Sequence, residues 1–306
     1  MQADYAIIGG GIVGLSVAWG LLGRGHKVIV IDGEDGAFRA SRGNFGLVWV
    51  QSKGMNQPRY AEWSQGSAAA WAGYAAELAE ETGRDIPLDQ NGGLDLHFSD
   101  ETLEKTVAQY ETLKSKLGGN YPYEILRGNA LRREEPHLGP KAGKVVVTAG
   151  LGAAQVGPQL GFKAPVRPQR GQVLITEKLP KMINRPSLIA RQVDEGGIQI
   201  GATNEEVGHD DRVTTPGVAH LAAEAVAAYP FLARAQLVRS WAALRILTPD
   251  GLPIYQQSRE MPGAYLVTCH SGITLSAAHA RFLPEWLDAT EAAPNLEVFS
   301  EDRFTL

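Results

Sequence analysis

The first 32 residues alternate between short apolar runs and a glycine-rich turn. Residues 4–8 form an apolar run that predicts a strand, and residues 9–14 predict a turn. Apolar residues then recur at helical spacing, which predicts a helix over residues 12–23. Residues 27–32 are β-branched and apolar, a pattern typical of a strand buried on both faces of a parallel sheet. The pattern therefore predicts a right-handed β–α–β unit.

The rest of the chain carries both helical and strand-like patterns. Helical spacing predicts helices over residues 59–82, 99–117 (with Ser99 or Asp100 as N-cap), 218–228, and from 272 to a break before Pro284. Strand-like runs occupy residues 144–149, 171–176, 187–193, 197–203, 241–244 and 264–268. The fold class that follows is α/β (α+β). We expect a Rossmann-like nucleotide-binding domain with an inserted antiparallel-sheet domain.

Composition narrows the class of protein. A length of 306 residues, 44% hydrophobic and 21% charged, allows one or two domains with a well-buried core. Intrinsic disorder and disulfide-dependent miniproteins are excluded. The formal charge of −5 argues against a nucleic-acid partner, whose phosphates favour a basic face. With Cys269 as its one cysteine, the chain has no intrachain disulfide or multi-thiolate zinc site, and we expect no metal.

An uncharged stretch near the N-terminus has the length of a membrane span. Residues 5–23 comprise 19 residues without a charge, but six are glycines and three of these are consecutive. Such a run interrupts a spanning helix, and no basic residue precedes it as in a signal peptide. We expect a cytoplasmic protein without a membrane span, and attachment to a membrane through partner subunits stays open.

The turn after the first predicted strand has the spacing Gly9-x-Gly11-x-x-Gly14, and Asp32 ends the next strand. Gly9 permits a tight turn, Gly11 lets the backbone approach a pyrophosphate, and Gly14 lets helix and strand pack closely. The helix N-terminus offers N–H groups to phosphates, and Asp32 can accept hydrogen bonds from ribose hydroxyls. In this strand–turn–helix context the spacing indicates a dinucleotide site, which leaves NAD and FAD as alternatives.

A second predicted helix start lies near the C-terminus. Residues 265–274 read as strand, turn and helix start, so backbone N–H groups would again face negative charge. A reduced flavin carries such charge, whereas a reduced nicotinamide is neutral, so this second site favours FAD. Residues 40–46 form a small polar loop in which Ser41 and Arg42 can meet phosphate oxygens. The alternative for this segment is a plain surface loop.

Five stretches, in order along nearly the whole chain, carry a family resemblance: residues 7–15, 40–46, 168–172, 244–253 and 269–274. Together they resemble the FAD-dependent amino-acid oxidase superfamily of glycine, sarcosine and D-amino-acid oxidases. Within it, the chain most resembles the catalytic subunits of hydrogen cyanide synthase, opine oxidase and D-hydroxyproline dehydrogenase. The resemblance implies a discontinuous FAD-binding domain of residues 1–50, 141–165 and 240–306. It implies a substrate domain of residues 51–140 and 166–239.

The resemblance also implies which residues contact FAD and substrate. The implied cofactor-binding residues are Ile8, Gly9, Gly11, Ile12, Val13, Gly14, Asp32, Ser41, Arg42, Asn44, Gly46, Leu47, Ala149, Gly150, His270, Ser271, Gly272, Ile273 and Thr274. The implied substrate-binding residues are Arg245, Val48 and Ser271. Arg245 is the implied catalytic residue, and it binds a substrate carboxylate.

Arg245 suits that role on chemical grounds. A guanidinium presents a bidentate fork to a carboxylate. Residues 241–244 before it are apolar, where a charge is costly unless it faces a cavity. The alternative is a salt-bridged structural arginine. The implied reaction is hydride transfer from the substrate to flavin N5, and the resulting imine is hydrolysed by water. No side-chain base is required, and we expect His270 to be a turn residue beside the flavin.

One departure from the relatives concerns residues 138–143. Relatives have a longer passage there, with a helix, a strand that contacts the adenine side of FAD, and a hairpin. The shorter passage affects the adenine contact and part of the nucleotide-domain sheet. It leaves Arg245 and the glycine turn untouched.

The predicted function is an FAD-dependent dehydrogenase or oxidase that acts on the C–N bond of an amino acid or secondary amine. Opines, D-hydroxyproline and glycine are the implied substrate types, and electron-transfer partner subunits in a hetero-oligomer are the implied partners. Two alternatives stay open: an NAD-dependent Rossmann dehydrogenase, and a shortened, non-catalytic flavoprotein-like subunit. A visible spectrum tests the first alternative, because bound flavin absorbs blue light. Anaerobic reduction by candidate substrates tests the second, because a non-catalytic subunit would stay oxidised with all of them.

Overall fold

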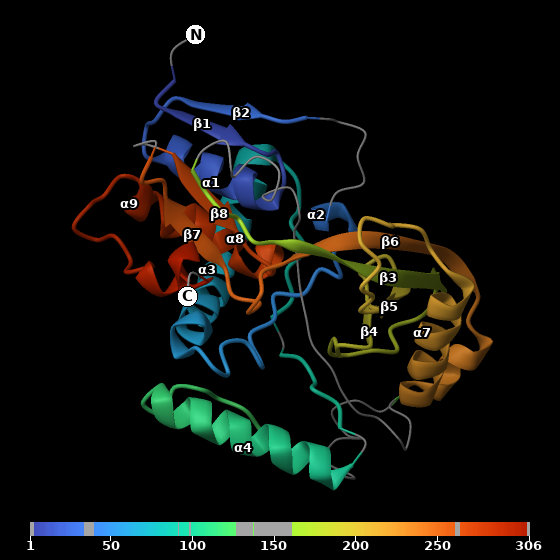
Figure 1. Ribbon diagram of the computed structural model, residues 1–306. Helices are drawn as coiled ribbons and strands as arrows, with labels where there is room; N and C mark the ends of the chain where they lie inside the picture. The colour runs from blue at the N-terminus through green and yellow to red at the C-terminus, as the bar shows by residue number, and fades with distance from the viewer. Residues whose placement is uncertain are drawn as a thin grey trace.

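The computed structural model describes residues 3–33, 40–90, 92–97, 99–126, 137, 161–260 and 264–304. Figure 1 shows the N-terminal β–α–β unit beside the C-terminal helices, and a separate antiparallel sheet with α7 next to it. Within these residues, no helix is long and apolar enough to cross a bilayer.

The predicted β–α–β unit is confirmed, but the expectation that its second strand is buried on both faces is wrong, since Ile31 is 53% exposed. Strands β1 (Tyr5–Ile8) and β2 (Val28–Ile31) pair in parallel, and α1 (Ile12–Gly23) connects them. The glycine turn therefore lies at the carboxyl end of β1, the edge at which open α/β sheets bind ligands.

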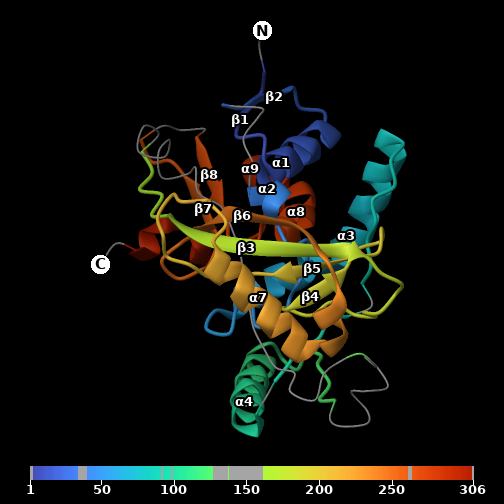
Figure 2. The ribbon, with the colours of Figure 1, turned by 90° about the vertical axis from the view of Figure 1, so that its right-hand side faces the viewer.

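The strand-rich middle of the chain forms one antiparallel sheet. Its strand order is β4-β5-β3-β6. The strands are β3 (Arg167–Lys178), β4 (Ala190–Gln192), β5 (Gly197–Gly201) and β6 (Leu237–Leu247). β3 and β6 are longer than the apolar runs that predicted them, because each pairs with the other beyond its apolar centre. Figure 2 shows this sheet between α2 and the β–α–β unit on one side and α7 on the other.

Helix α7 (Thr215–Ala228) closes the core of this sheet. Leu221 and Ala225 of α7 pack with Leu174 and Ile198 of the strands in one buried cluster. The Thr214 hydroxyl caps the helix by accepting a hydrogen bond from the Gly217 N–H at 3.3 Å. A short 3₁₀ helix, η2 (Pro230–Arg234), follows and begins where Pro230 was predicted to end the helix.

Two helices form the layer beside the β–α–β unit. Helix α3 (Pro58–Thr82) and α8 (Gly272–Arg281) pack on each other, and α8 also packs on α1. Ser67 interrupts the apolar stripe of α3 because its hydroxyl donates to the Thr274 carbonyl at 2.7 Å. A Cβ at Gly20 of α1 would lie 2.2 Å from the Ala280 carbonyl oxygen, so this glycine allows the close helix crossing.

The remaining described elements complete the C-terminal part and the edge of the molecule. β7 (Ile254–Gln257) and β8 (Tyr265–Thr268) form an antiparallel hairpin, of which only β8 was predicted. α9 (Leu283–Leu287) follows α8 at the break expected before Pro284, and η3 (Glu297–Phe299) and η4 (Glu301–Phe304) end the described chain. α4 (Asp100–Lys116) has Ser99 as its N-cap, as predicted.

The predicted strand over residues 144–149 lies outside the described residues. The division of the chain into two discontinuous domains stays a prediction. β6 is continuous across residue 240, where that division was drawn.

Candidate active site

A cavity of about 490 Å³ lies where the antiparallel sheet meets the helical layer. Segments that are far apart in the sequence contribute most of its wall: residues 40–53, the middle of β3 (Gly171 and Val173), residues 201–205, residues 243–245 of β6, and residues 270–274. Leu188, Ile189 and part of α7 complete the wall. The fold thus brings residues 40–46 and 270–274, which were both predicted to contact FAD, to one cavity with Arg245.

The glycine turn has the conformation that its spacing predicted. Gly9 has a φ of 112°, which favours glycine, and its N–H donates to the Ile31 carbonyl at 2.8 Å. A Cβ at Gly14 would lie 2.0 Å from the Gly9 carbonyl oxygen, so helix and turn pack in contact. A Cβ at Gly11 would meet only the Ser41 hydroxyl, at 3.7 Å. The backbone at Gly11 therefore stays open to an approaching group.

Asp32 and Ser41 both contact this turn. The Asp32 carboxylate accepts a hydrogen bond from the Gly10 N–H at 2.6 Å, so it lies against the turn. The Ser41 hydroxyl accepts from the Ile12 N–H, in the first turn of α1, at 3.1 Å. This contact ties the 40–46 segment to the helix start where phosphates would bind.

The prediction that residues 40–46 form a loop is partly wrong. Residues Ala40–Gly43 form one helical turn, α2, which directs Ser41 toward α1 and leaves Arg42 exposed. The prediction failed because a single turn is too short to show helical periodicity. Beyond α2, the Asn44 side chain accepts from the Gly46 N–H at 2.7 Å, and Gly46 has a φ of 77°.

The N-terminus of α8 lies against that of α1. A Cβ at Gly272 would meet the side chains of Ile12 and Val13 at 3.1 and 3.2 Å. Two helix starts from opposite ends of the sequence are therefore neighbours. Both present backbone N–H groups on the side from which anions are bound.

Two buried polar atoms of the cavity wall have no partner among the described residues: Nε1 of Trp49 and Nε2 of His270. Burial lowers the pKa of His270 well below its ordinary value, and the nearby cations Lys53 and Arg245 lower it further. His270 is therefore neutral. Because buried polar groups are rarely left unpaired, these two atoms fit a cavity that takes a ligand with polar edges, as a flavin has.

Arg245 reaches the cavity from β6 and has neutral partners. Its Nη1 donates to the Thr203 carbonyl at 2.6 Å, the Asn204 side chain at 2.7 Å and the Gln169 side chain at 3.2 Å. Burial lowers its pKa to about 10, against the opposing effect of Glu205. No carboxylate of the described residues forms an ion pair with Arg245. Those residues therefore give no support to the alternative of a salt-bridged structural arginine.

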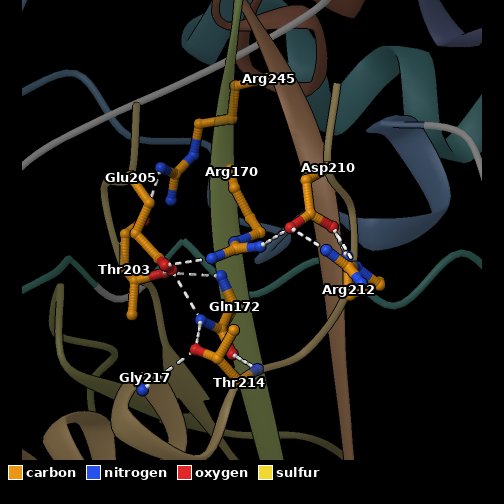
Figure 3. Close-up of polar contacts among 9 residues, drawn as sticks. All are labelled: Arg170, Gln172, Thr203, Glu205, Asp210, Arg212, Thr214, Gly217 and Arg245. Atoms are coloured by element: carbon orange, nitrogen blue, oxygen red, sulfur yellow. Dashed lines mark hydrogen bonds and ion pairs between the residues drawn. The ribbon is translucent and has the colours of Figure 1, made fainter. Parts of the chain in front are cut away.

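A charged network beside Arg245 holds the segment that carries its acceptors (Figure 3). Arg170 is 4% exposed and pairs with Glu205 at 2.6 Å and Asp210 at 2.9 Å. Glu205 also accepts hydrogen bonds from Thr203 and from Gln172, the latter at 2.7 Å. These contacts fix residues 203–205 against β3 and thereby position the guanidinium of Arg245.

The predicted site residues fall into three groups. Those that line the cavity are Asn44, Leu47, Arg245, His270, Ser271, Ile273 and Thr274. Those that lie beside it, at the two helix starts or packed behind the wall, are Ile8, Gly9, Gly11, Ile12, Val13, Gly14, Asp32, Ser41, Arg42, Gly46, Val48 and Gly272. Ala149 and Gly150 lie outside the described residues. The roles of all these residues stay predictions.

Sequence reasoning missed Lys53 and Glu205. Lys53 lines the cavity and donates from Nζ to the Ser271 hydroxyl at 2.5 Å. One signal was present: Lys53 is the single charged residue in the stretch 43–58. In the described ranges, no three His, Cys, Asp or Glu side chains group closely enough to hold a metal ion.

Comparisons with known proteins identify the family of the chain. The family model described as "FAD dependent oxidoreductase" (DAO) matches residues 4–144 and 137–286. A subunit of the opine oxidase of Agrobacterium tumefaciens (strain Ach5) is 35% identical over 364 residues, which cover 99% of this chain and 98% of that protein. The hydrogen cyanide synthase subunit HcnC of Pseudomonas protegens is 34% identical over 168 residues, which cover 52% of this chain and 40% of that protein.

The fold is that of a solved glycine oxidase from Geobacillus kaustophilus. Its structure superposes with a TM-score of 0.87 at 23% identity, over 97% of this chain and 98% of that one. The alignment with the opine oxidase subunit spans 364 positions, more than the 306 residues of this chain, so that relative has residues without a counterpart here. The two family-model matches overlap at 137–144, where the sequence has its short passage.

The cofactor follows from the family. The matching family model is that of FAD-dependent oxidoreductases, so the FAD prediction is confirmed and NAD is set aside. The recognised superfamily, the fold class and the assignment as an oxidoreductase are confirmed with it. By its sequence over most of its length and by its fold, the chain belongs to the DAO family of FAD-dependent oxidoreductases.

Proposed function

We propose that this protein oxidises the C–N bond of a small amino acid or secondary amine, such as an opine, at the cavity lined by Arg245 and His270. The observation that carries the proposal is the state of Arg245. It is a largely buried cation that faces the cavity with neutral partners only, among the described residues. Such a guanidinium is suited to bind a carboxylate bidentately.

The residues that would hold FAD are those of the two helix starts. The turn at 9–14 and Ser41 would face the pyrophosphate, Asp32 the ribose, and residues 271–274 the flavin ring. When bound, FAD supplies the two-electron acceptor that the side chains themselves do not provide. Ala149 and Gly150 are proposed for the adenine side by resemblance.

The chain's own groups supply binding and orientation. Arg245 would fix the carboxylate and so the direction of the substrate Cα–H bond. Leu47, Trp49 and Ile273 line the same cavity with large apolar surface and would limit water around the reacting carbon. Burial holds the pKa of His270 well below its ordinary value, so its side chain carries no positive charge near neutral pH. A substrate with a neutral amine needs no side-chain base.

Names of relatives support the substrate type and the partners. One relative is named as a subunit of opine oxidase and another as a subunit of hydrogen cyanide synthase. We propose that this chain, too, works with partner subunits that accept its electrons. A cytoplasmic location, at a membrane when the partners are there, is part of the same proposal.

Anaerobic mixing of the purified, FAD-loaded protein with a panel of amines tests the function. The panel contains glycine, D-proline derivatives and opines, and the readout is loss of the flavin's blue absorbance. We expect at least one member to bleach the flavin, and Arg245→Met to slow bleaching strongly while it keeps bound FAD. If the yellow protein stays oxidised with every member, it is a non-catalytic subunit and the proposal fails.

A further inference from the structure

The cavity has a second cation besides Arg245. Lys53 lies just before α3 and lines the cavity, whereas Arg245 enters from β6. Among the described residues, neither side chain has a carboxylate within ion-pair distance. Two positive charges that face one cavity without acidic partners are unfavourable unless a ligand neutralises them.

The surroundings of Lys53 are neutral. Its Nζ donates to the Ser271 hydroxyl at 2.5 Å and lies 6.0 Å from the centre of the Tyr60 ring. Burial raises the pKa of the neighbouring Cys269 thiol to about 12, so the thiol is uncharged near neutral pH. Burial also lowers the pKa of Lys53 to about 8, which leaves its ammonium mostly protonated at pH 7.

His270 lies close to both cations. The charges of Lys53 and of Arg245 each act on its imidazole. All three side chains line the same cavity, and Lys53 donates to Ser271, the residue after His270, at the start of α8. A ligand that extends past His270 could contact both at once.

The acidic residues of the cavity wall do not neutralise these cations. Glu205 is bonded to Arg170, Gln172 and Thr203, and Glu224 lies half-buried on α7. No ion pair joins Glu224 to Lys53 or Arg245 in the described part of the chain. Among the described residues each of the two cations is therefore without an ion-pair partner and can bind a negative group of the ligand.

We propose that Lys53 binds a second carboxylate of the substrate while Arg245 binds the first, so that Lys53 selects secondary amines with two carboxylates over amines with one. This inference rests on the function proposed above and names a residue that sets the specificity of the same cavity. Lys53 is then a specificity-determining residue, since a substrate with one carboxylate leaves its ammonium unpaired.

A pair of thioethers that cannot be oxidised as amines tests this role. Thiodiacetate has two carboxylates, and (methylthio)acetate has one at the same position relative to sulfur. Both are titrated into the FAD-loaded protein by calorimetry at pH 7, for wild type, Lys53→Met and Lys53→Arg. Lys116→Met, at the exposed end of α4, is the surface control.

Wild type and Lys116→Met should bind thiodiacetate about 10- to 100-fold more tightly than (methylthio)acetate. Lys53→Met should lose this preference with little change toward (methylthio)acetate, and Lys53→Arg should keep most of it. Equal weakening of both ligands by Lys53→Met would mean that Lys53 acts on the flavin or the cavity as a whole, and would overturn the inference. So would an unchanged preference. Because the thioethers report binding alone, this result is independent of whether any amine bleaches the flavin.

Discussion

Gly171 of β3 lies directly against the guanidinium of Arg245 on the neighbouring strand β6. A Cβ built at Gly171 would be 2.6 Å from Nη2 and 2.7 Å from Cζ of Arg245. In the strand pairing Gly171 lies opposite Ala243, two residues before Arg245, so the side chain crosses the sheet diagonally over the glycine. The absence of a side chain at 171 is therefore what allows the guanidinium its position.

Gly171→Ala should displace Arg245 and weaken binding of any carboxylate ligand about 10-fold, with kcat changed less than KM. Steady-state kinetics and calorimetric titration of (methylthio)acetate measure this. Gly23→Ala is the matched control, since nothing lies within 4 Å of a Cβ there. An unchanged affinity in Gly171→Ala would show that the guanidinium can move without loss of binding.

Arg245→Met should keep FAD and lose about 30- to 1000-fold in kcat/KM, because one partner of a buried carboxylate contact is removed. Arg245→Lys should recover only part of the activity, as an ammonium does not offer the bidentate fork. The flavin spectrum and anaerobic reduction rates are the measurements. Turnover at the wild-type rate with wild-type affinity would remove Arg245 from the substrate site.

The glycine turn offers a contrast between cofactor binding and folding. Gly11 has a φ of −78° and an open Cβ direction, so Gly11→Ala should leave the stability of the apoprotein unchanged but weaken FAD at least about 10-fold. Gly14→Ala forces a contact of 2.0 Å with the Gly9 carbonyl and should cost about 1–3 kcal/mol of stability as well. Thermal unfolding without FAD and a FAD-binding titration separate the two. A Gly11→Ala protein that binds FAD normally would contradict the proposed pyrophosphate position.

Arg170→Met should destabilise the fold by about 3–5 kcal/mol, since it leaves Glu205 and Asp210 without their buried partner. Arg59→Met, which breaks an exposed pair with Glu62, should cost less than about 0.5 kcal/mol. Burial acts to raise the pKa of Glu205, but hydrogen bonds led by that from Arg170 hold it below its ordinary value. The contribution of ionised Glu205 to the free energy of unfolding is therefore present near neutral pH and is lost as the pH falls through the acid range. Urea unfolding at pH 7 and pH 4 should show a smaller difference between wild type and Arg170→Met at pH 4.

The lowered pKa of Lys53 predicts that dicarboxylate binding depends on pH. Its pKa in the free protein is lowered to about 8 by burial, so the cavity loses a positive charge as the pH rises through that value. The dissociation constant of thiodiacetate should be flat below pH 8 and should rise up to tenfold per pH unit above it. Burial raises the pKa of the Cys269 thiol and of the Tyr60 phenol, and it lowers the pKa of His270. All three side chains therefore stay uncharged in this pH range. Lys53→Arg should bind thiodiacetate equally at pH 7 and pH 9, and a slope that persists in this variant would assign the titration elsewhere.

Local patterns in the sequence were enough for the β–α–β unit, the glycine turn and the Ser99 cap. Each of these depends on residues within a few positions of one another, through helical periodicity, a required φ or a single hydrogen bond. The same reasoning failed for α2, because one helical turn shows no periodicity, and for β7, because Ile254 and Tyr255 are followed by two glutamines and form no strand-like apolar run. FAD was predictable because the glycine turn stands at a fixed spacing between a strand and a helix. The role of Arg245 in binding a carboxylate stays a prediction that the family resemblance implies.

The tertiary structure alone decided what surrounds those residues. Lys53 and Arg245 are 192 positions apart in the chain, and no local pattern relates them. Only the packing of α8 against α1 and α3, and the pairing of β3 with β6, brings them to one cavity beside His270. The sequence by itself determined which chemistry the chain carries. The fold determined which charges lack a partner, because pairing and burial arise from contacts between distant segments.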